Sequence, residues 1–291
     1  MIPPPFEYLR PATVADAISL LQQHGEDAKI LSGGQSLIPM MKLRIARPAW
    51  LIDINAIPDL DYIREHDGHL AIGGLVRERQ IEASDLIRKR YTILHDTASV
   101  IADPQVRNLA TIGGNLAHGD PANDHPAVML AVGAQVVATG PNGARTIKAE
   151  DFFLSIFTTA LDAGEILTEI RVPTPAARSG GSYFKLERKV GDFATAAVAA
   201  QITLDDRAAF AKVGIGLTNV GPVPIKARQA EDFLRGKVST PENISEAARL
   251  AAEEAQPTSD LRGPAEYKKG LVKEFTKRAL NRAIERAGGA R

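Results

Sequence analysis

The sequence predicts an α+β protein built as two domains, residues 1–176 and residues 177–291. Its length of 291 residues exceeds that of one average domain. Short apolar strands, glycine turns and helical segments alternate in the first domain, whereas three strands precede three helices in the second. A stretch rich in proline, glycine and serine, residues 173–181, separates the two patterns and marks the boundary.

The first domain begins with a helix over residues 15–24, where Thr13 and Asp16 can cap the start and Gly25 can end it. Residues 140–143, Gly-Pro-Asn-Gly, form a hairpin turn between two of its strands. The other elements expected in this domain are strands over residues 28–32, 50–54, 69–72, 135–139, 144–148 and 166–172, and helices over residues 91–102 and 124–132.

The second domain is expected to contain strands over residues 182–188, 194–204 and 212–219, then helices over residues 227–234, 241–254 and 266–286. The last helix carries many lysines and arginines mixed with glutamates. Two interpretations stay open: a solvated helix face with ion pairs, or a contact surface for a partner.

Composition narrows the classes of function. The 35 basic and 35 acidic side chains balance, which argues against nucleic acid as the main partner. The absence of cysteine fits a reducing, cytoplasmic compartment and leaves no thiolates for an iron–sulfur cluster in this chain. No apolar run of about 18 residues predicts a membrane span, and the start Met1-Ile2-Pro3-Pro4-Pro5 does not resemble a signal peptide. Contact with a membrane surface stays open.

Two glycine-rich segments, residues 31–37 (LSGGQSL) and residues 111–115 (TIGGN), are the strongest candidates for a binding site. Glycine lets a ligand approach the backbone closely, and successive free N–H groups in a turn bind anions. Ser36, Thr111 and Asn115 can add side-chain donors to phosphate oxygens. We therefore expect two turns that hold one diphosphate. Neither segment is a G-x-G-x-x-G fingerprint or a P-loop, which disfavours a nicotinamide-dependent dehydrogenase.

Carboxylates near the second segment fit a ligand that also carries sugar hydroxyls. Asp124 is the candidate acceptor for such hydroxyl groups. The alternative for Asp120 and Asp124 is turn formation or helix capping, which we expect for at least one of them. A third glycine pair, Gly73-Gly74, is interpreted as a structural turn.

These motifs resemble one family when they are taken in order. Residues 33–39 (GGQSLIP) and 110–116 (ATIGGNL) are similar to the FAD-binding medium subunits of molybdenum hydroxylases, the xanthine dehydrogenase group. Within that group, the medium subunit of aerobic carbon monoxide dehydrogenase is the nearest match. The resemblance continues through residues 165–167 (EIL), 184–186 (FKL), 191–194 (GDFA) and 260–263 (DLRG).

The resemblance implies a fold of the vanillyl-alcohol oxidase (PCMH) type. Two subdomains, about residues 1–55 and 56–176, would hold non-covalent FAD, and the C-terminal domain would follow. Lys185 would approach the flavin ring, where a cation stabilises the reduced anionic form, and Phe193 would shield the ring. The cofactor-binding residues implied are Ile30, Leu31, Ser32, Gly33, Gly34, Gln35, Ser36, Leu37, Ile101, Thr111, Ile112, Gly113, Gly114, Asn115, Asp124, Leu167 and Lys185.

Ordinary structural roles remain alternatives for some of these residues. Ile101, Leu167 and Phe193 can be core residues, and Lys185 can belong to a surface ion pair. We assign no catalytic residue and no metal ligand to this chain.

The resemblance also implies a function within a larger enzyme. A large partner subunit with a molybdenum cofactor would oxidise the substrate, and a small iron–sulfur subunit would pass electrons to FAD in this chain. The FAD would deliver them to a quinone, NAD or oxygen, in an assembly expected to be a dimer of heterotrimers. Two alternatives remain: a stand-alone flavin oxidase or reductase of the same fold, and a non-enzymatic nucleotide-binding scaffold.

Overall fold

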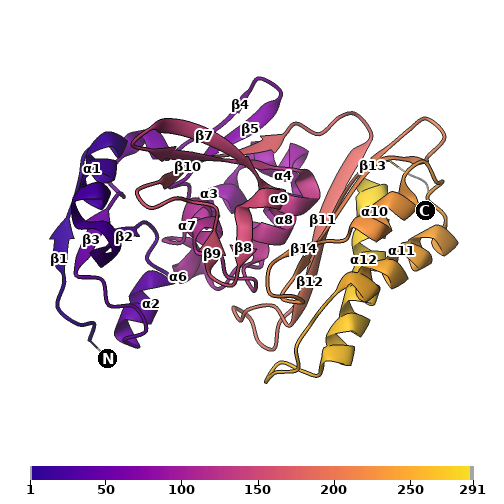
Figure 1. The fold of residues 1–291 in the computed structure, drawn as a ribbon. Coiled ribbons are helices and arrows are strands. Elements are labelled where there is room, and N and C mark those ends of the chain that lie inside the picture. Colours follow the sequence, from indigo (N-terminus) through magenta and orange to yellow (C-terminus); the bar gives the residue numbers. More distant parts are fainter. Residues whose placement is uncertain (1, 289–291) are drawn as a thin grey trace.

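The computed structural model describes residues 2–288. Residue 1 of the first expected domain and residues 289–291 of the second lie outside the described part. Three main sheets follow each other along the chain and lie side by side, with helices between and outside them (Figure 1). The fold is of the α+β class expected from the sequence.

The first sheet is parallel, with the strand order β1-β3-β2. Helix α1 begins after Thr13, whose hydroxyl oxygen accepts a hydrogen bond from the Asp16 amide, and it ends at Gly25 with a positive φ. Its buried Ala17 and Ile18 pack on the sheet. The bounds are β1 (Glu7–Leu9), α1 (Val14–His24), β2 (Ala28–Leu31), α2 (Leu37–Lys42) and β3 (Trp50–Asp53).

The second sheet is antiparallel, with the order β4-β5-β10-β6-β7. Gly140 pairs with Gly143 across the hairpin predicted from the sequence. Its strands are β4 (Ile63–His66), β5 (His69–Gly73), β6 (Gln135–Gly140), β7 (Gly143–Lys148) and β10 (Ile166–Pro173), and the small hairpin β8 (Phe153–Ser155) and β9 (Thr158–Thr159) lies nearby.

Helices surround this second sheet. The segment expected as one helix over residues 91–102 is shorter, because the chain turns at Val100 and Ala102 takes a positive φ. Ile101 therefore lies in a turn. The helices are α3 (Glu78–Ala83), α4 (Asp85–Arg90), α5 (Thr92–Ser99), α6 (Pro104–Arg107), α7 (Ile112–Ala117), α8 (Asp124–Val132) and α9 (Ala149–Phe152).

The third sheet is antiparallel and has the order β11-β12-β13-β14. Gly180 was expected in the linker, but it lies within β11. A Cβ there would overlap the carbonyl oxygen of Ala283 on α12, so this glycine permits close helix–sheet packing. The elements are β11 (Ser179–Leu186), β12 (Ala196–Leu204), β13 (Phe210–Thr218), β14 (Ile225–Lys226), α10 (Arg228–Leu234), α11 (Pro241–Glu254) and α12 (Ala265–Arg286).

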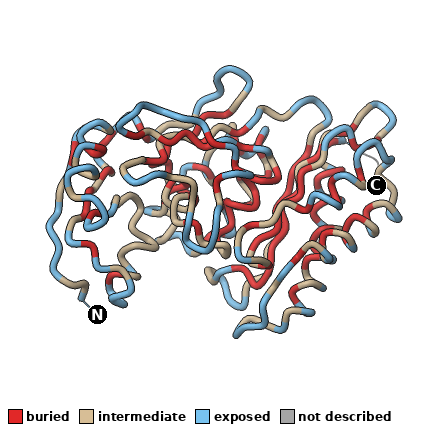
Figure 2. Tube along the Cα trace, viewed as in Figure 1, coloured by how far each residue is buried: buried red, intermediate tan, exposed pale blue. Residues whose placement is uncertain are grey.

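This sheet is buried on both faces, with α12 against one face and α5 and α8 against the other (Figures 1 and 2). Gly216 on β13 makes the second contact close, since a Cβ there would overlap the carbonyl oxygen of Ala127 on α8. The packing places the first turn of α8, which carries Asp124, beside the edge strand β11.

Some of the cations of the basic helix α12 form ion pairs within the chain. Lys268 is buried and its Nζ lies 2.7 Å from Asp260, while Arg286 binds Asp96 on α5 through both terminal guanidinium nitrogens, Nη1 and Nη2. Arg278 forms an exposed ion pair one helical turn from Glu274. No helix within residues 2–288 is both long and apolar enough to cross a lipid bilayer.

Candidate cofactor site

A cavity of about 630 Å³ lies where the first sheet, the α7–α8 region and β11 meet. All site residues expected from the sequence line it, except Leu31 and Ile112. Ile112 is instead fully buried in the core, and Leu31 is the last residue of β2. The structure thus brings together residues that are up to about 150 positions apart in the sequence.

The first glycine-rich segment leaves β2 and turns along the cavity wall. Within the described protein, the backbone N–H groups of residues 33–36 donate no hydrogen bond, so they are available to a ligand. Gly34 has a φ of 72°, which favours glycine. This turn matches the expected anion site, because adjacent unpaired amides attract phosphate oxygens.

The second glycine-rich segment is not the turn that we expected but the start of helix α7. Thr111 is its N-cap, and the Thr111 hydroxyl oxygen accepts a hydrogen bond from the Gly114 amide at 3.1 Å. The amides of Ile112 and Gly113 donate to the carbonyls of Val76 and Gly74. These amides are therefore already paired, and the segment presents side chains to the cavity instead.

Asn115 supplies one such side chain. Its Oδ1 is buried and has no hydrogen-bond partner within residues 2–288, and the residue lines the cavity. A buried polar atom without a partner is costly, so a ligand donor at this position would stabilise it.

The two segments touch each other. Ser32 Oγ lies 2.8 Å from Thr111 Oγ1, and a Cβ on Gly33 would lie 2.5 Å from the carbonyl oxygen of Leu109. Only a residue without a side chain fits here, so the glycine sets the distance between the segments. Both segments face the same cavity.

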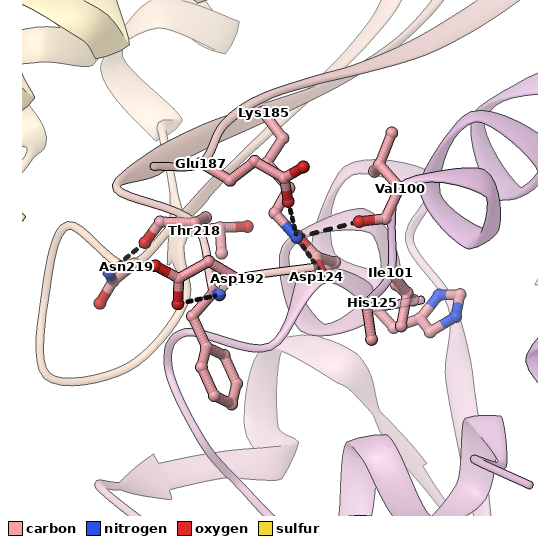
Figure 3. Close-up of polar contacts among 12 residues, drawn as sticks. Val100, Ile101, Asp124, His125, Lys185, Glu187, Asp192, Thr218 and Asn219 are labelled. Atoms are coloured by element: carbon pink, nitrogen blue, oxygen red, sulfur yellow. Dashed lines mark hydrogen bonds and ion pairs between the residues drawn. The ribbon is translucent and has the colours of Figure 1, made fainter. Parts of the chain in front are cut away.

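Asp124 and Lys185 also line the cavity and meet there in a buried network (Figure 3). Lys185 Nζ lies 3.1 Å from Asp124 Oδ2, 3.0 Å from the Val100 carbonyl oxygen and 3.5 Å from Glu187 Oε2. The Lys185 side chain is only 3% exposed, so the alternative of a surface ion pair is wrong. The Asp124 and Glu187 carboxylates both face the Lys185 ammonium. Lys185 therefore lines the cavity as a cation whose charge is balanced by neighbouring carboxylates.

Burial raises the pKa of Asp124, and the charge of Lys185 and the hydrogen bond from Tyr183 oppose that rise. Burial and the nearby Asp124 charge also raise the pKa of Tyr183 well above its ordinary value of 10.0. The Tyr183 hydroxyl therefore keeps its proton and acts as a donor.

The neighbouring carboxylate Asp120 has the structural role that was the alternative for both residues. Its Oδ1 accepts a hydrogen bond from the Ala122 amide at 2.8 Å and closes a turn. Asp124 instead bonds to β11.

The apolar candidates differ in their burial. Ile101 and Leu167 are 6% and 4% exposed, so they pack in the interior as well as lining the cavity. Phe193 is 46% exposed and is not a core residue. It follows Asp192, which binds Arg262 at 2.9 Å and so ties two of the family-like motifs together at the cavity mouth.

Several lining residues were missed by sequence reasoning. His118 and Asn123 belong to the polar run around the second segment, which could have indicated them. Phe157 lies on the β8–β9 hairpin, for which the sequence carried no signal. The main additions are Gly74, His118, Asn123, Phe157, Glu165 and Asp192.

The residues fit FAD. Unpaired amides at residues 33–36 suit a diphosphate, the Asp124 carboxylate suits sugar or ribityl hydroxyls, and the apolar wall suits an aromatic ring system. The fold and this site therefore define a dinucleotide-binding protein.

Comparison with known proteins specifies the family. Residues 4–175 match the FAD binding domain in molybdopterin dehydrogenase, and residues 181–283 match the CO dehydrogenase flavoprotein C-terminal domain. The chain is 46% identical to the carbon monoxide dehydrogenase medium chain of Hydrogenophaga pseudoflava, over 98% of this chain and 99% of the relative. Identity to the medium chain of Afipia carboxidovorans is 44%, with 99% of each chain covered.

Solved structures agree with this assignment. Carbon monoxide dehydrogenase from Hydrogenophaga pseudoflava has a TM-score of 0.96 at 48% identity, covering 98% of this chain and 99% of that one. Quinoline 2-oxidoreductase from Pseudomonas putida 86 has a TM-score of 0.92 at 32% identity, with 99% of each chain covered. The chain belongs to the FAD-binding medium subunits of the molybdenum hydroxylase family, which confirms the resemblance seen in the sequence. It is a flavoprotein subunit of a multi-subunit oxidoreductase, and its cofactor is FAD.

Proposed function

We propose that this chain carries electrons from the iron–sulfur clusters of a small partner subunit, through its FAD, to an external acceptor. The observation that carries the proposal is similarity over almost the whole chain to carbon monoxide dehydrogenase medium chains. A chain without cysteine has no thiolates to hold iron–sulfur clusters, so in this proposal the clusters that feed the flavin belong to another subunit. The flavin supplies the redox chemistry, and the protein binds and orients it.

The substrate belongs to the large molybdenum subunit in this proposal. More distant relatives include the medium chain of a glyceraldehyde dehydrogenase and the medium subunit of a nicotine 6-hydroxylase. Similar medium subunits therefore belong to enzymes that act on different substrates. Higher identity to the carbon monoxide dehydrogenase chains favours a carbon monoxide dehydrogenase-like complex. We propose a cytoplasmic dimer of heterotrimers with a quinone, NAD or oxygen as acceptor.

The FAD is proposed to be non-covalent, because the sequence offers no cysteine for a thioether link and its six histidines are scattered, with none in a loop that resembles a flavin tether. The residues that would hold it are the amide turn at 33–36, Thr111, Asn115 and Asp124. Denaturation should release all of the flavin into the supernatant, whereas flavin that stays on the precipitated chain would refute this part.

The electron-transfer role is tested with the complex purified from its native source. Anaerobic carbon monoxide should bleach the flavin absorbance in the complex, and the acceptor should restore it. The isolated FAD-loaded chain should not respond to carbon monoxide, although dithionite should reduce it. Turnover of a substrate by the isolated chain would instead support a stand-alone oxidase.

A variant complex separates flavin transfer from the earlier steps. In a complex that carries Gly33→Ala in this chain, we expect little bound FAD, normal reduction of the iron–sulfur clusters and loss of electron delivery to the acceptor. Unchanged delivery without FAD would contradict the proposed route.

A further inference from the structure

Asp124 accepts hydrogen bonds from two side chains of one strand, β11. Tyr183 and Lys185 lie two positions apart on β11, so they point to the same face of the sheet. The Tyr183 hydroxyl donates to Asp124 Oδ1 at 2.6 Å, and Lys185 Nζ donates to Asp124 Oδ2 at 3.1 Å. The C-terminal domain thus supplies one donor for each oxygen of a carboxylate in the FAD-binding domain.

Tyr183 differs from its two partners because it does not itself line the cavity. It is 6% exposed, and its hydroxyl also lies 3.2 Å from the Thr218 hydroxyl on β13. Asp124 and Lys185 do line the cavity. Any effect of Tyr183 on the cofactor must therefore pass through Asp124.

We propose that Tyr183 is a positioning residue for FAD, which holds Asp124 in the orientation and charge state that accept a cofactor hydroxyl. The proposal rests on the role of Asp124 in the proposed site. Each carboxylate oxygen has a second lone pair beyond the one that its β11 donor uses, so the ligand can bind without displacing either donor. The site for the cofactor is then completed by the second domain.

The charge of Asp124 depends on these donors. Burial raises its pKa, and the Lys185 ammonium and the Tyr183 hydroxyl lower it. Removing the hydroxyl leaves Lys185 as the only direct donor to this carboxylate among residues 2–288, so the carboxylate should take up a proton at a higher pH. The titratable and charged groups around this position are Tyr183, Lys185, Glu187, His125 with its partner Glu78, and, on the cavity wall, His118 and Asp192.

The experiment measures FAD affinity of the full flavin-free chain by fluorescence at several pH values. For Tyr183→Phe we expect FAD affinity to fall as the pH is lowered, by about tenfold more than in the wild type at the acidic end of the range. Asp124→Asn should bind FAD roughly tenfold or more weakly at every pH, and the double variant should show no added pH dependence.

The matched control is Ser182→Ala on the same strand. Its buried hydroxyl donates to the Ala279 carbonyl on α12, away from the cavity, so its loss should lower stability without changing the pH profile of FAD affinity. If Tyr183→Phe cannot be purified folded, Thr218→Val removes the other partner of the same hydroxyl and should shift the profile in the same direction by a smaller amount.

The outcomes distinguish the two levels of the proposal. A loss of affinity in Asp124→Asn, with a pH profile of wild-type form in Tyr183→Phe, would overturn the role of Tyr183 and leave the site intact. Equal loss at all pH values in Tyr183→Phe and Ser182→Ala would show a purely structural role. Normal affinity in Asp124→Asn would overturn both the site and the inference.

Discussion

Glu78 on α3 and His125 on α8 are fully buried, and their Oε2 and Nε2 atoms lie 2.7 Å apart. His125 directly follows Asp124 in the sequence, and Glu78 follows Arg77, which forms a β-bridge with Thr111. The Glu78–His125 pair therefore links two parts of the site. One is the Arg77–Thr111 bridge at the second glycine-rich segment, and the other is helix α8, which carries Asp124. Glu78 and Thr111 are thus connected through Arg77, and His125 adjoins Asp124, so a pair outside the cavity supports two residues that line it.

Breaking this pair should be costly. Glu78→Ala leaves the buried His125 Nε2 without its hydrogen-bond partner, so we expect the free energy of unfolding to fall by roughly 1–3 kcal/mol in urea titrations. The matched control is Arg249→Ala, which breaks two exposed helical ion pairs, with Glu246 and Glu253, and should cost about 1 kcal/mol. Similar losses in both variants would mean that the Glu78–His125 contact is not buried in solution.

Glu231 on α10 should make stability depend on pH. Burial raises its pKa from 4.5 to about 7, although it accepts a hydrogen bond from the Ile215 amide and lies near Lys226. The folded chain thus binds this proton more tightly than the unfolded chain. Stability falls as pH rises through the window between these two pKa values.

The variant Glu231→Gln isolates this effect. As the pH rises from 5 to 8, the unfolding free energy of the wild type should fall by up to about 3 kcal/mol more than that of the variant, which has no carboxyl group at this position. The other ionisable groups contribute equally to both proteins, so the difference reports on Glu231 alone. Urea unfolding at both pH values measures the difference. Parallel pH profiles for the two proteins would show that the Glu231 pKa is not raised.

At the scale of elements, glycines decide how closely segments approach. A Cβ on Gly113 would overlap the carbonyl oxygen of Gly74, and one on Gly33 would crowd the backbone at Leu109 and Thr111. Gly74, the second residue of the pair interpreted as a structural turn, is thus the residue against which the start of α7 packs. These contacts bring the two glycine-rich segments to one cavity.

Gly33→Ala should separate the segments. We expect FAD affinity to fall at least tenfold and the unfolding free energy to fall by about 1–3 kcal/mol, because backbone atoms must shift to admit the methyl group. Gly270→Ala on α12 is the control, since its methyl group meets no atom within 4 Å and should stabilise the helix by roughly 0.5–1 kcal/mol. FAD titrations and thermal unfolding measure both. Normal FAD binding in Gly33→Ala would show that the segments need not touch.

The sequence predicted the longer elements because their patterns are local. Helix α11 and the β6–β7 hairpin carry a cap, a turn or a clear period that needs no distant partner. The strand β1 has only three residues and owes its structure to pairing with β3, about 40 residues away, so no local signal marks it. Paired glycines made α7 look like a turn, whereas Thr111 caps a short helix there.

The same limit applies to the site. Glycine-rich motifs and Asp124 could be found from residue types and from family resemblance. The contact between Tyr183 and Asp124 could not, since it joins residues 59 positions apart across a domain contact. Its existence depends on Gly216, which lets α8 lie close to β13.

At the scale of the whole molecule, the cavity depends on three parts of the chain. The amide turn at 33–36 follows β2 of the first sheet, Thr111 and Asp124 belong to the starts of α7 and α8, and Lys185 lies on β11 of the third sheet. Arg286 on α12 binds Asp96 on α5 and holds these two helices together. A ligand that contacts all three parts should stabilise them together.

Removal of FAD from the full chain should therefore lower the local stability of segments other than the two glycine-rich segments. We expect amide hydrogen exchange to become faster at residues 32–37, at the start of α8 and also in β11, where Tyr183 and Lys185 hold Asp124. Helix α11 covers the outer face of the C-terminal domain and has no residue on the cavity wall, so its exchange should not change. Faster exchange confined to residues before 176 would contradict a cofactor site shared by both domains. If β11 responds together with residues 32–37, the C-terminal domain is part of the cofactor site, because an independent domain would keep its protection when the ligand leaves.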